Sequence, residues 1–208
     1  MPLSGRGADV LLTALVPVAS TGETLSYSTA SREARITAAT HRHLDPDSTS
    51  IVLYANSTVV PSSGYTIRHV QGVFVLDSTT WSSTDNFTAD IEYLPATSVA
   101  GGREWQLNIE ADMFEISTFG SSGWKEFMPN LNGATVTIGR YWSDSAFLDA
   151  LTNDARFVVE LVPNAASSTT SRYEGFVRVA GDQVGAAVDA IVGEQINLVV
   201  DGQLFFTT

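Results

Sequence analysis

The sequence contains no cysteine. The chain therefore has no disulfide bond, no thiolate zinc site and no cysteine nucleophile, which is typical of proteins from a reducing compartment. Lysine is almost missing too: Lys125 is the only one among eleven basic residues, and the formal net charge is −12. Because nucleic-acid binding depends mostly on lysine and arginine contacts to phosphate, this charge argues against a protein that grips DNA or RNA.

Long apolar runs are also missing. The clearest run, residues 10–19, is too short to span a bilayer. It has Asp9 at its start, Pro17 inside it and only Arg6 ahead of it. We expect it to be a buried or subunit-bridging strand rather than a signal peptide, and we expect no membrane insertion. Hydrophobic residues make up 44% of the 208 positions, which predicts a folded chain with a sizeable core.

The most regular pattern in the chain begins at residue 103. Polar and apolar residues alternate there, which predicts a half-buried strand with one face in water. The polar face consists of Glu104, Gln106, Asn108, Glu110 and Asp112. The apolar face consists of Trp105, Leu107, Ile109 and Ala111, and we expect it to be core. A second alternating run covers residues 134–142.

Between these two runs the sequence predicts a loop of about twenty residues, which is unusually long for a compact domain. It contains large apolar side chains in a setting rich in glycine, serine and asparagine, and such side chains need a surface to pack on. They are Phe119, Trp124, Phe127 and Met128.

The rest of the chain predicts a mostly β fold, a β-sandwich or rolled barrel with one flanking α-helix. The helix is expected at 143–153, with Ser143 or Asp144 as its N-cap. Residues 21–49 read as loop or arm with a short extended piece at 34–39, and residues 180–193 fit a loop or a short helix. Further strands are expected at 51–55, 65–70, 73–76, 87–94, 156–162, 171–179, 194–200 and 203–206, the last two joined by an Asp201-Gly202 hairpin turn.

Three segments follow from these patterns. Residues 1–40 form an N-terminal strand and arm, residues 41–98 an N-terminal β block, and residues 99–208 a β-sandwich that carries the helix. The boundary near residue 98 lies in a linker-like stretch, TSVAGG, at 97–102.

Candidate chemistry is sparse. His41, His43, Asp45 and Asp47 alternate, and in an extended chain they could point one way and bind a divalent metal, although a polar strand end followed by a turn explains them more simply. A G-x-S-x-G motif and a phosphate-binding loop are both missing. Paired carboxylates for glycoside hydrolysis stay open, since sequence spacing does not predict distance. We expect no enzyme, no cofactor and no metal.

Residues 117–129 read STFGSSGWKEFMP, and residues 172–175 read RYEG. These segments resemble the tail tube (major tail) proteins of tailed bacteriophages, with the likeness clearest over residues 100–208. The resemblance implies a structural subunit that assembles into stacked hexameric rings, each a multi-subunit β-barrel ring through which DNA is delivered. It also implies a place in the virion tail, assembly in the host cytoplasm, and tape measure, tail terminator and tail tip proteins as partners besides the chain itself.

The patterns and the resemblance together predict two surfaces. Strand edges that pair between subunits would place the polar face in the lumen, where an acidic and neutral wall lets DNA pass without binding it. The lumen-facing residues are then Glu104, Gln106, Asn108, Glu110 and Asp112. The expected inter-ring or inter-subunit residues are Thr118, Phe119, Trp124, Lys125, Phe127 and Met128. The alternative is a non-catalytic β-sandwich binding module, such as a carbohydrate-binding or virion surface domain.

Overall fold

The computed structural model describes residues 9–13, 16–78, 80–117, 124–163, 171–186 and 191–207. These residues form mostly β-strands with one α-helix, which confirms the predicted fold class. The chain divides into two compact units. Unit 1 comprises Met1–Val99, Arg156–Phe176 and Phe205–Thr208, and unit 2 comprises Ala100–Ala155 and Val177–Leu204. The segment boundaries predicted at residues 40 and 98 stay predictions.

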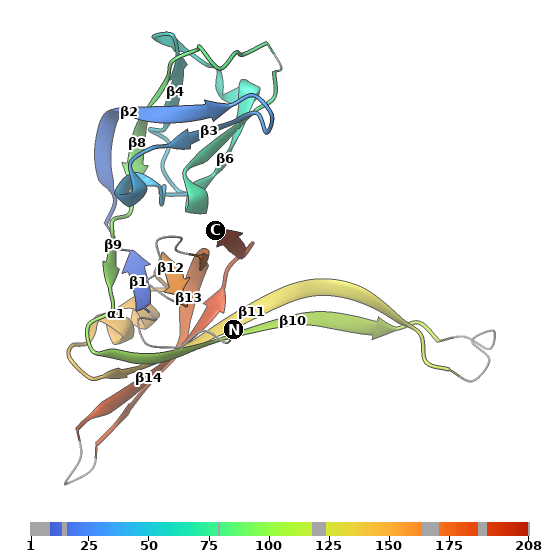
Figure 1. Cartoon of the computed structure of the whole chain (residues 1–208). Coiled ribbons are helices and arrows are strands. Elements are labelled where there is room, and N and C mark those ends of the chain that lie inside the picture. Colours follow the sequence, from blue (N-terminus) through green and yellow to red (C-terminus); the bar gives the residue numbers. More distant parts are fainter. Residues whose placement is uncertain are drawn as a thin grey trace. The chain divides into compact units, whose positions relative to one another are not determined.

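Unit 1 contains a seven-stranded antiparallel sheet (Figure 1). Its order is β5 (Thr58–Val59), β4 (Val52–Ala55), β8 (Phe87–Tyr93), β2 (Val18–Ser28), β3 (Glu33–Ile36), β7 (Val73–Leu76) and β6 (Tyr65–Arg68). Three short 3-10 helices accompany it: η1 (Ala39–His41), η2 (Ser62–Gly64) and η3 (His69–Gln71). Leu53, Phe74 and Phe87 are fully buried in its core. The strand predicted over residues 87–94 is confirmed as β8, in which Phe87, Ala89 and Ile91 are buried.

The loop or arm predicted at residues 21–49 is wrong over β2. This strand is eleven residues long, yet Leu25 is its only fully buried residue. A register shift between Ser20 and Glu23 also interrupts its pairing with β8. The strand is held by backbone hydrogen bonds to β3 and β8 on its two sides rather than by an apolar face. A hydrophobic pattern therefore could not reveal it.

The second sheet has eight strands. Its order is β10 (Gly102–Glu115), β11 (Phe127–Tyr141), β14 (Gly193–Val200), β13 (Arg172–Gly185), β12 (Arg156–Val162), β1 (Asp9–Thr13) and β9 (Ala96–Ser98), with β15 (Phe205–Thr207) beside β13. Because β1 pairs directly with β9, the whole seven-stranded sheet is an insertion between two neighbouring strands of the second sheet.

Several local predictions change in this sheet. The expected hairpin at Asp201-Gly202 is wrong, because β15 pairs with β13. The reason is that β11 and β13 already occupy both sides of β14. Residues 181–185 are neither loop nor helix but the end of β13, whereas residues 187–190 lie outside the described part.

The prediction of a long loop after residue 112 is also largely wrong. β10 continues to Glu115 and β11 begins at Phe127, and the two strands pair as a long hairpin (Figure 1). The helix, α1 (Ala146–Thr152), is shorter than predicted. Its N-cap is Ser145, although the Asp144 carboxylate does accept a bond from the Ala146 N–H at 3.1 Å. No described helix combines the length and the apolar character needed to span a membrane.

Candidate functional site

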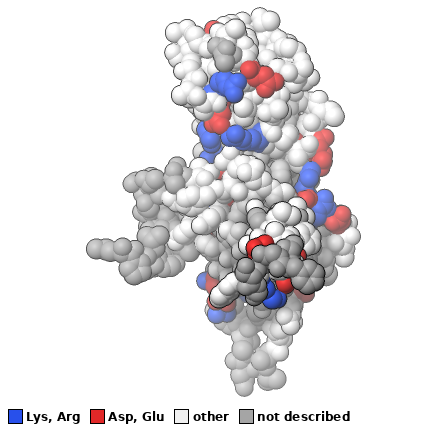
Figure 2. All heavy atoms as spheres, turned by 90° about the vertical axis from the view of Figure 1, so that its right-hand side faces the viewer, with Lys and Arg blue, Asp and Glu red and all other residues white. Residues whose placement is uncertain are grey.

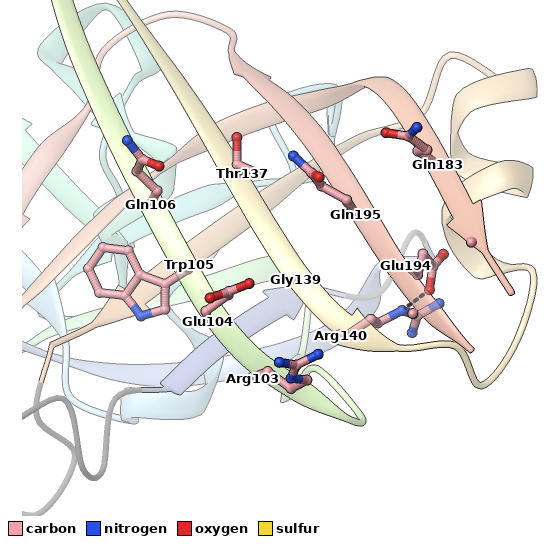
Figure 3. A pocket seen from close by; sticks show the side chains of 12 residues that line it. Arg103, Glu104, Trp105, Gln106, Thr137, Gly139, Arg140, Gln183, Glu194 and Gln195 are labelled. Carbon is pink, nitrogen blue, oxygen red and sulfur yellow. Dashed lines mark hydrogen bonds and ion pairs between the residues drawn. The ribbon is translucent and has the colours of Figure 1, made fainter. Parts of the chain in front are cut away.

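Four strands of unit 2 present a continuous polar face. Residues opposite one another in antiparallel strands point to the same face, so the register defines rows across the sheet. One row, across β10, β11, β14 and β13, is Gln106, Thr137, Asn197 and Gly181. The next is Glu104, Gly139, Gln195 and Gln183. Figure 3 shows Gln106, Thr137, Gln195 and Gln183 on neighbouring strands, and the residues drawn there line an open groove of about 630 Å³.

The polar face is held together within the sheet. The Thr137 hydroxyl donates to Asn197 Oδ1 at 3.2 Å. The Glu104 side chain lies across Gly139, where a Cβ would come within 2.9 Å of Glu104 Cγ. A side chain at position 139 would therefore push this carboxylate away. The polar face consists mostly of amide and hydroxyl groups, with carboxylates along β10.

The opposite face of β11 and β14 is apolar and buried. Val136, Ile138, Ile196 and Leu198 are completely inaccessible to solvent. Arg140 lies on this face, pairs with the buried Glu194, bonds Asp144 Oδ1 at 3.0 Å and covers the Phe147 ring of α1 at 4.6 Å. This arginine therefore ties α1 to the sheet and leaves the polar face as the accessible one.

A second carboxylate accompanies this buried pair. Asp182 Oδ1 and Glu194 Oε1 are both buried and have no hydrogen-bond partner among the described residues. Burial raises the pKa of Asp182, and the negative charge of Glu194 raises it further, against a smaller opposing effect of Arg140. The Asp182 carboxyl therefore holds a proton more tightly than an isolated aspartic acid does.

The β10–β11 hairpin changes character beyond Ala111. A register shift follows this residue, and the next pairs are Met113 with Pro129, Phe114 with Met128 and Glu115 with Phe127. We call residues 109–117 and 124–131 the distal hairpin. Its exposed large apolar side chains are Ile109, Met113, Phe114, Ile116, Trp124, Phe127, Met128 and Leu131. Because side chains alternate along a strand, Phe114 and Met128 continue the polar face, whereas Met113 and Phe127 continue the apolar face.

Beyond Asp112, the distal hairpin is therefore apolar on both faces. Its shape is set by its own contacts: Lys125 Nζ pairs with Glu115 Oε2 at 2.9 Å, and the Ile116 N–H donates to the Glu126 carbonyl at 2.8 Å. Trp124 is 81% exposed. A preformed ribbon with two uncovered apolar faces is typical of a binding surface.

All five predicted lumen residues, Glu104 to Asp112, are exposed on one face of β10. Of the six predicted interface residues, Trp124, Lys125, Phe127 and Met128 are exposed, while Thr118 and Phe119 lie outside the described residues. The lumen and interface roles stay predictions. Ile109 and Ala111 are not core as expected but exposed, and Trp105 and Leu107 are only partly buried.

Sequence reasoning missed the polar residues of the other three strands and the apolar residues Met113, Phe114 and Leu131. For β14 the signal was present, because buried Glu194, Ile196 and Leu198 alternate with exposed Gln195 and Asn197. The distal hairpin shows no alternation of polar and apolar residues, because apolar side chains lie on both of its faces.

The histidine-aspartate segment does not converge on one point. His41 ends a 3-10 helix rather than lying in a strand; it pairs with Glu23 at 2.7 Å and stacks on Tyr93. Asp47 pairs instead with Arg156 at 3.0 Å. The four side chains therefore do not point one way.

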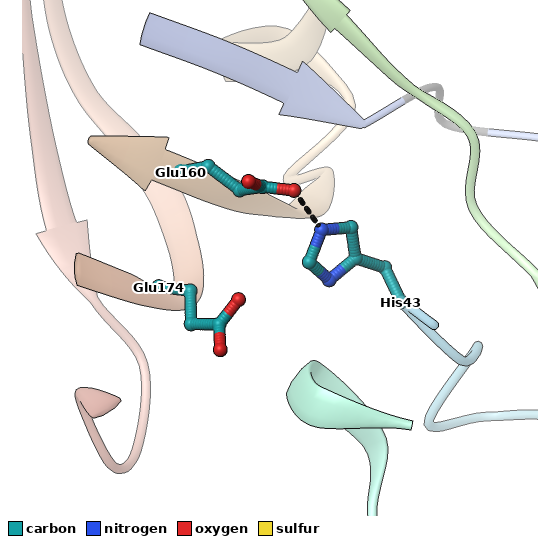
Figure 4. Close-up of side chains that lie close together, drawn as sticks. All are labelled: His43, Glu160 and Glu174. Carbon is teal, nitrogen blue, oxygen red and sulfur yellow. Dashed lines mark hydrogen bonds and ion pairs between the residues drawn. The ribbon is translucent and has the colours of Figure 1, made fainter. Parts of the chain in front are cut away.

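His43 joins a buried cluster within unit 1 (Figure 4). Its Nδ1 bonds the Val70 carbonyl at 2.7 Å, and its Nε2 contacts the Glu160 carboxylate. Potential ligand atoms of His43, Glu160 and Glu174 lie within 4.8 Å of one another. Arg172 already forms ion pairs with both carboxylates: its Nε is 3.1 Å from Glu174 Oε2 and 3.4 Å from Glu160 Oε2.

The electrostatics of this cluster fit ion pairing. Burial raises the pKa of Glu160, but His43, Arg172 and Arg42 together outweigh burial and lower it. Thr207 also donates its hydroxyl to Glu174 Oε1 at 2.5 Å. The cluster therefore joins β12, β13 and β15 to the segment that follows η1.

No protein-family model matches the sequence, and no curated protein matches it. Two solved structures are similar in fold. One is a chain from the tail of an empty GTA particle, computed with helical refinement and C6 symmetry, at 11% identity and a TM-score of 0.47 over 55% of this chain and 87% of that one. The other comes from the virion of a native gene transfer agent particle, at 12% identity and a TM-score of 0.46 over 54% and 89% of the two chains.

Proposed function

We propose that this chain is a phage tail tube subunit that assembles into stacked, hexameric rings and conducts DNA. The observation that carries the proposal is the change within one hairpin. Its proximal part belongs to a polar, accessible four-stranded face, and its distal part is apolar on both faces. A wall facing water and a ribbon needing partners are the two surfaces that a self-assembling tube requires.

The edge of the sheet supports ring closure. β10 is fourteen residues long and forms one edge of the second sheet. An unpaired edge of this length is a template for another strand. Closing several copies into a ring pairs each such edge with a neighbouring subunit, and the four-stranded polar faces then form one inner wall.

The chemistry of that wall suits DNA passage. Neutral amides and hydroxyls dominate it, and Glu104, Glu110 and Asp112 add negative charge. Such a wall repels phosphate instead of binding it. The strongly negative net charge, which argues against a DNA-binding protein, therefore suits a DNA conduit.

The distal hairpin supports contact with other copies. Its eight exposed apolar side chains, at roughly 100 Å² each, offer on the order of 800 Å², one partner's share of a standard protein interface. Because both faces are apolar, full burial requires a surface on each side, as an insertion between two neighbours provides. Following the resemblance to tail tube proteins, the tape measure, tail terminator and tail tip proteins are the further partners.

Electron microscopy of the purified protein tests this function. We expect negatively stained tubes or stacked rings from the parent chain, and folded subunits without tubes from the Trp124→Ala, Phe127→Ala double variant. If the double variant forms tubes at the parent's concentration, the distal hairpin is not a contact between subunits. A parent that stays monomeric and binds glycans would favour the binding-module alternative.

A further inference from the structure

Three arginines lie close together in unit 1, although the chain carries a net charge of −12. Arg35 is on β3, opposite Val73 of β7. Its neighbour Ile36 donates its N–H to the Gly72 carbonyl at 3.0 Å, and a Cβ at Gly72 would lie 2.7 Å from the Arg42 carbonyl. The third, Arg172, contacts Glu160. The same carboxylate pairs with His43, which follows Arg42 in the sequence.

Two of these guanidinium groups have no partner among the described residues. Arg35 and Arg42 make no hydrogen bond or ion pair with the described residues, and Arg42 Nε is buried without a partner. Burial lowers the pKa of Arg42, and the charge of Arg172 lowers it further, while Glu174 and Glu160 oppose this at longer range. By contrast, Arg68, Arg140, Arg156 and Arg178 each form an ion pair.

The position of Arg42 is fixed by its neighbours. His41 is bound to Glu23 and stacked on Tyr93, and His43 is bound to the Val70 carbonyl and to Glu160. Gly72 has φ +60 and lies so close to the Arg42 backbone that no larger residue fits there. The backbone at Arg42 is therefore held between two anchored histidines.

We propose that Arg35 and Arg42 bind a phosphate-type oxyanion, while Arg172 stays paired with Glu160 and Glu174. A guanidinium fork matches the oxygens of such an anion and forms paired, charge-assisted hydrogen bonds. Two forks from different elements suit a tetrahedral anion, whose oxygens point in several directions, better than a planar carboxylate. Figure 2 shows a band of blue basic side chains on the face drawn there, with Asp and Glu side chains beside it. This local positive charge in an acidic chain attracts anions.

Calorimetric titration of the full chain tests the site, with inorganic phosphate and glycerol 3-phosphate as probes at constant ionic strength in chloride. Direct binding is measured because phosphate stabilises many proteins by exclusion from their surface. We expect one site per chain, and affinity at least about tenfold weaker in Arg35→Gln and in Arg42→Gln. Arg32→Gln, an exposed arginine of the same unit with the same change in charge, should bind as the parent does.

Binding of both probes identifies the phosphate group itself as the ligand, and binding of glycerol 3-phosphate alone identifies a phosphate ester. Circular dichroism verifies folding of each variant. If Arg42→Gln does not fold, Arg35→Gln, at a partly exposed position, decides the question alone. Absence of binding to the parent, or equal affinity in the parent and every folded variant, would overturn the proposal.

Discussion

Asp112 and Phe114 lie on the same face of β10, two residues apart, and between them that face changes from polar to apolar. Phe114 is 56% exposed, so the apolar part begins in the open rather than in the core. The accessible polar wall therefore ends within one strand, and the surface that needs a partner starts at once. This boundary separates the proposed lumen from the proposed subunit contact.

The apolar side of this boundary is tested by Phe114→Ser combined with Met128→Ser, two residues paired on the same face. Each buried side chain should contribute about 1.5–3 kcal/mol to assembly. We expect a folded subunit that sediments as a monomer at concentrations where the parent polymerises. Leu148→Ser, at an exposed position on α1, serves as the control and should polymerise normally. Polymers of the double variant at parental concentration would count against the interface.

The polar side is tested by Glu110→Lys with Asp112→Lys, which changes each subunit's charge by +4. Tubes should still form, since both side chains are exposed. The inner wall should then bind DNA in a manner that weakens as salt rises. Binding of short single-stranded DNA to purified tubes measures this. Asp77→Lys with Asp149→Lys makes the same charge change elsewhere; binding as strong in this control would show that the position on β10 does not matter.

The cluster at His43 makes a stability prediction. His43→Ala removes one partner of a buried ion pair and should lower the free energy of unfolding by about 3 kcal/mol. His41→Ala removes a partly exposed pair and should cost about 1 kcal/mol or less. Urea unfolding with and without a chelator measures both, and the chelator should change neither. A chelator-dependent loss of stability in the parent alone would instead indicate a metal at this cluster.

The same cluster sets an acid limit. The pKa of Glu160 is lower in the folded chain than its ordinary value of 4.5, so its contribution to stability is present above pH 4.5 and is lost as pH falls through the folded-state pKa. We expect Glu160→Gln to unfold less steeply with acid than the parent. An unchanged acid limb in thermal melts would remove Glu160 from this role.

Asp182 has the opposite pH dependence. Its folded-state pKa is raised above 3.8, so its bound proton stabilises the fold below that pH, and this stability is lost as pH rises through the folded-state pKa. Asp182→Asn should therefore gain stability over the parent as pH rises, with no gain in strong acid. Melting temperatures of the unassembled subunit across this range measure the effect. A difference in melting temperature between Asp182→Asn and the parent that stays constant with pH would contradict the raised pKa of Asp182.

Much of the fold could be predicted where one face of a strand is wet or where β-branched residues cluster. β7 and β12 have the bounds that the sequence indicates, because their runs of Val, Leu and Phe are short and mostly buried. β2 could not be predicted, since backbone pairing rather than an apolar face holds it. The distal hairpin could not be predicted either, because two apolar faces leave no alternation.

The candidate site divides in the same way. The polar face of β10 follows from its own alternation. Its continuation through Thr137, Asn197 and Gln183 depends on strand order and register, which join residues far apart in the sequence. The environment of His43 depends on Glu160, more than a hundred residues away. No local pattern in the sequence indicates such a contact.

The central claim is that the polar face of β10, β11, β14 and β13 forms the inner wall of a tube. Electron cryo-microscopy of the assembled chain tests this most directly, through a helical reconstruction that resolves strands. The account predicts that these four strands are innermost, that Gln106, Thr137 and Asn197 point toward the axis, and that the distal hairpin lies between neighbouring subunits. A reconstruction with the polar face on the outer surface, or an inner wall built from the seven-stranded sheet, would contradict it.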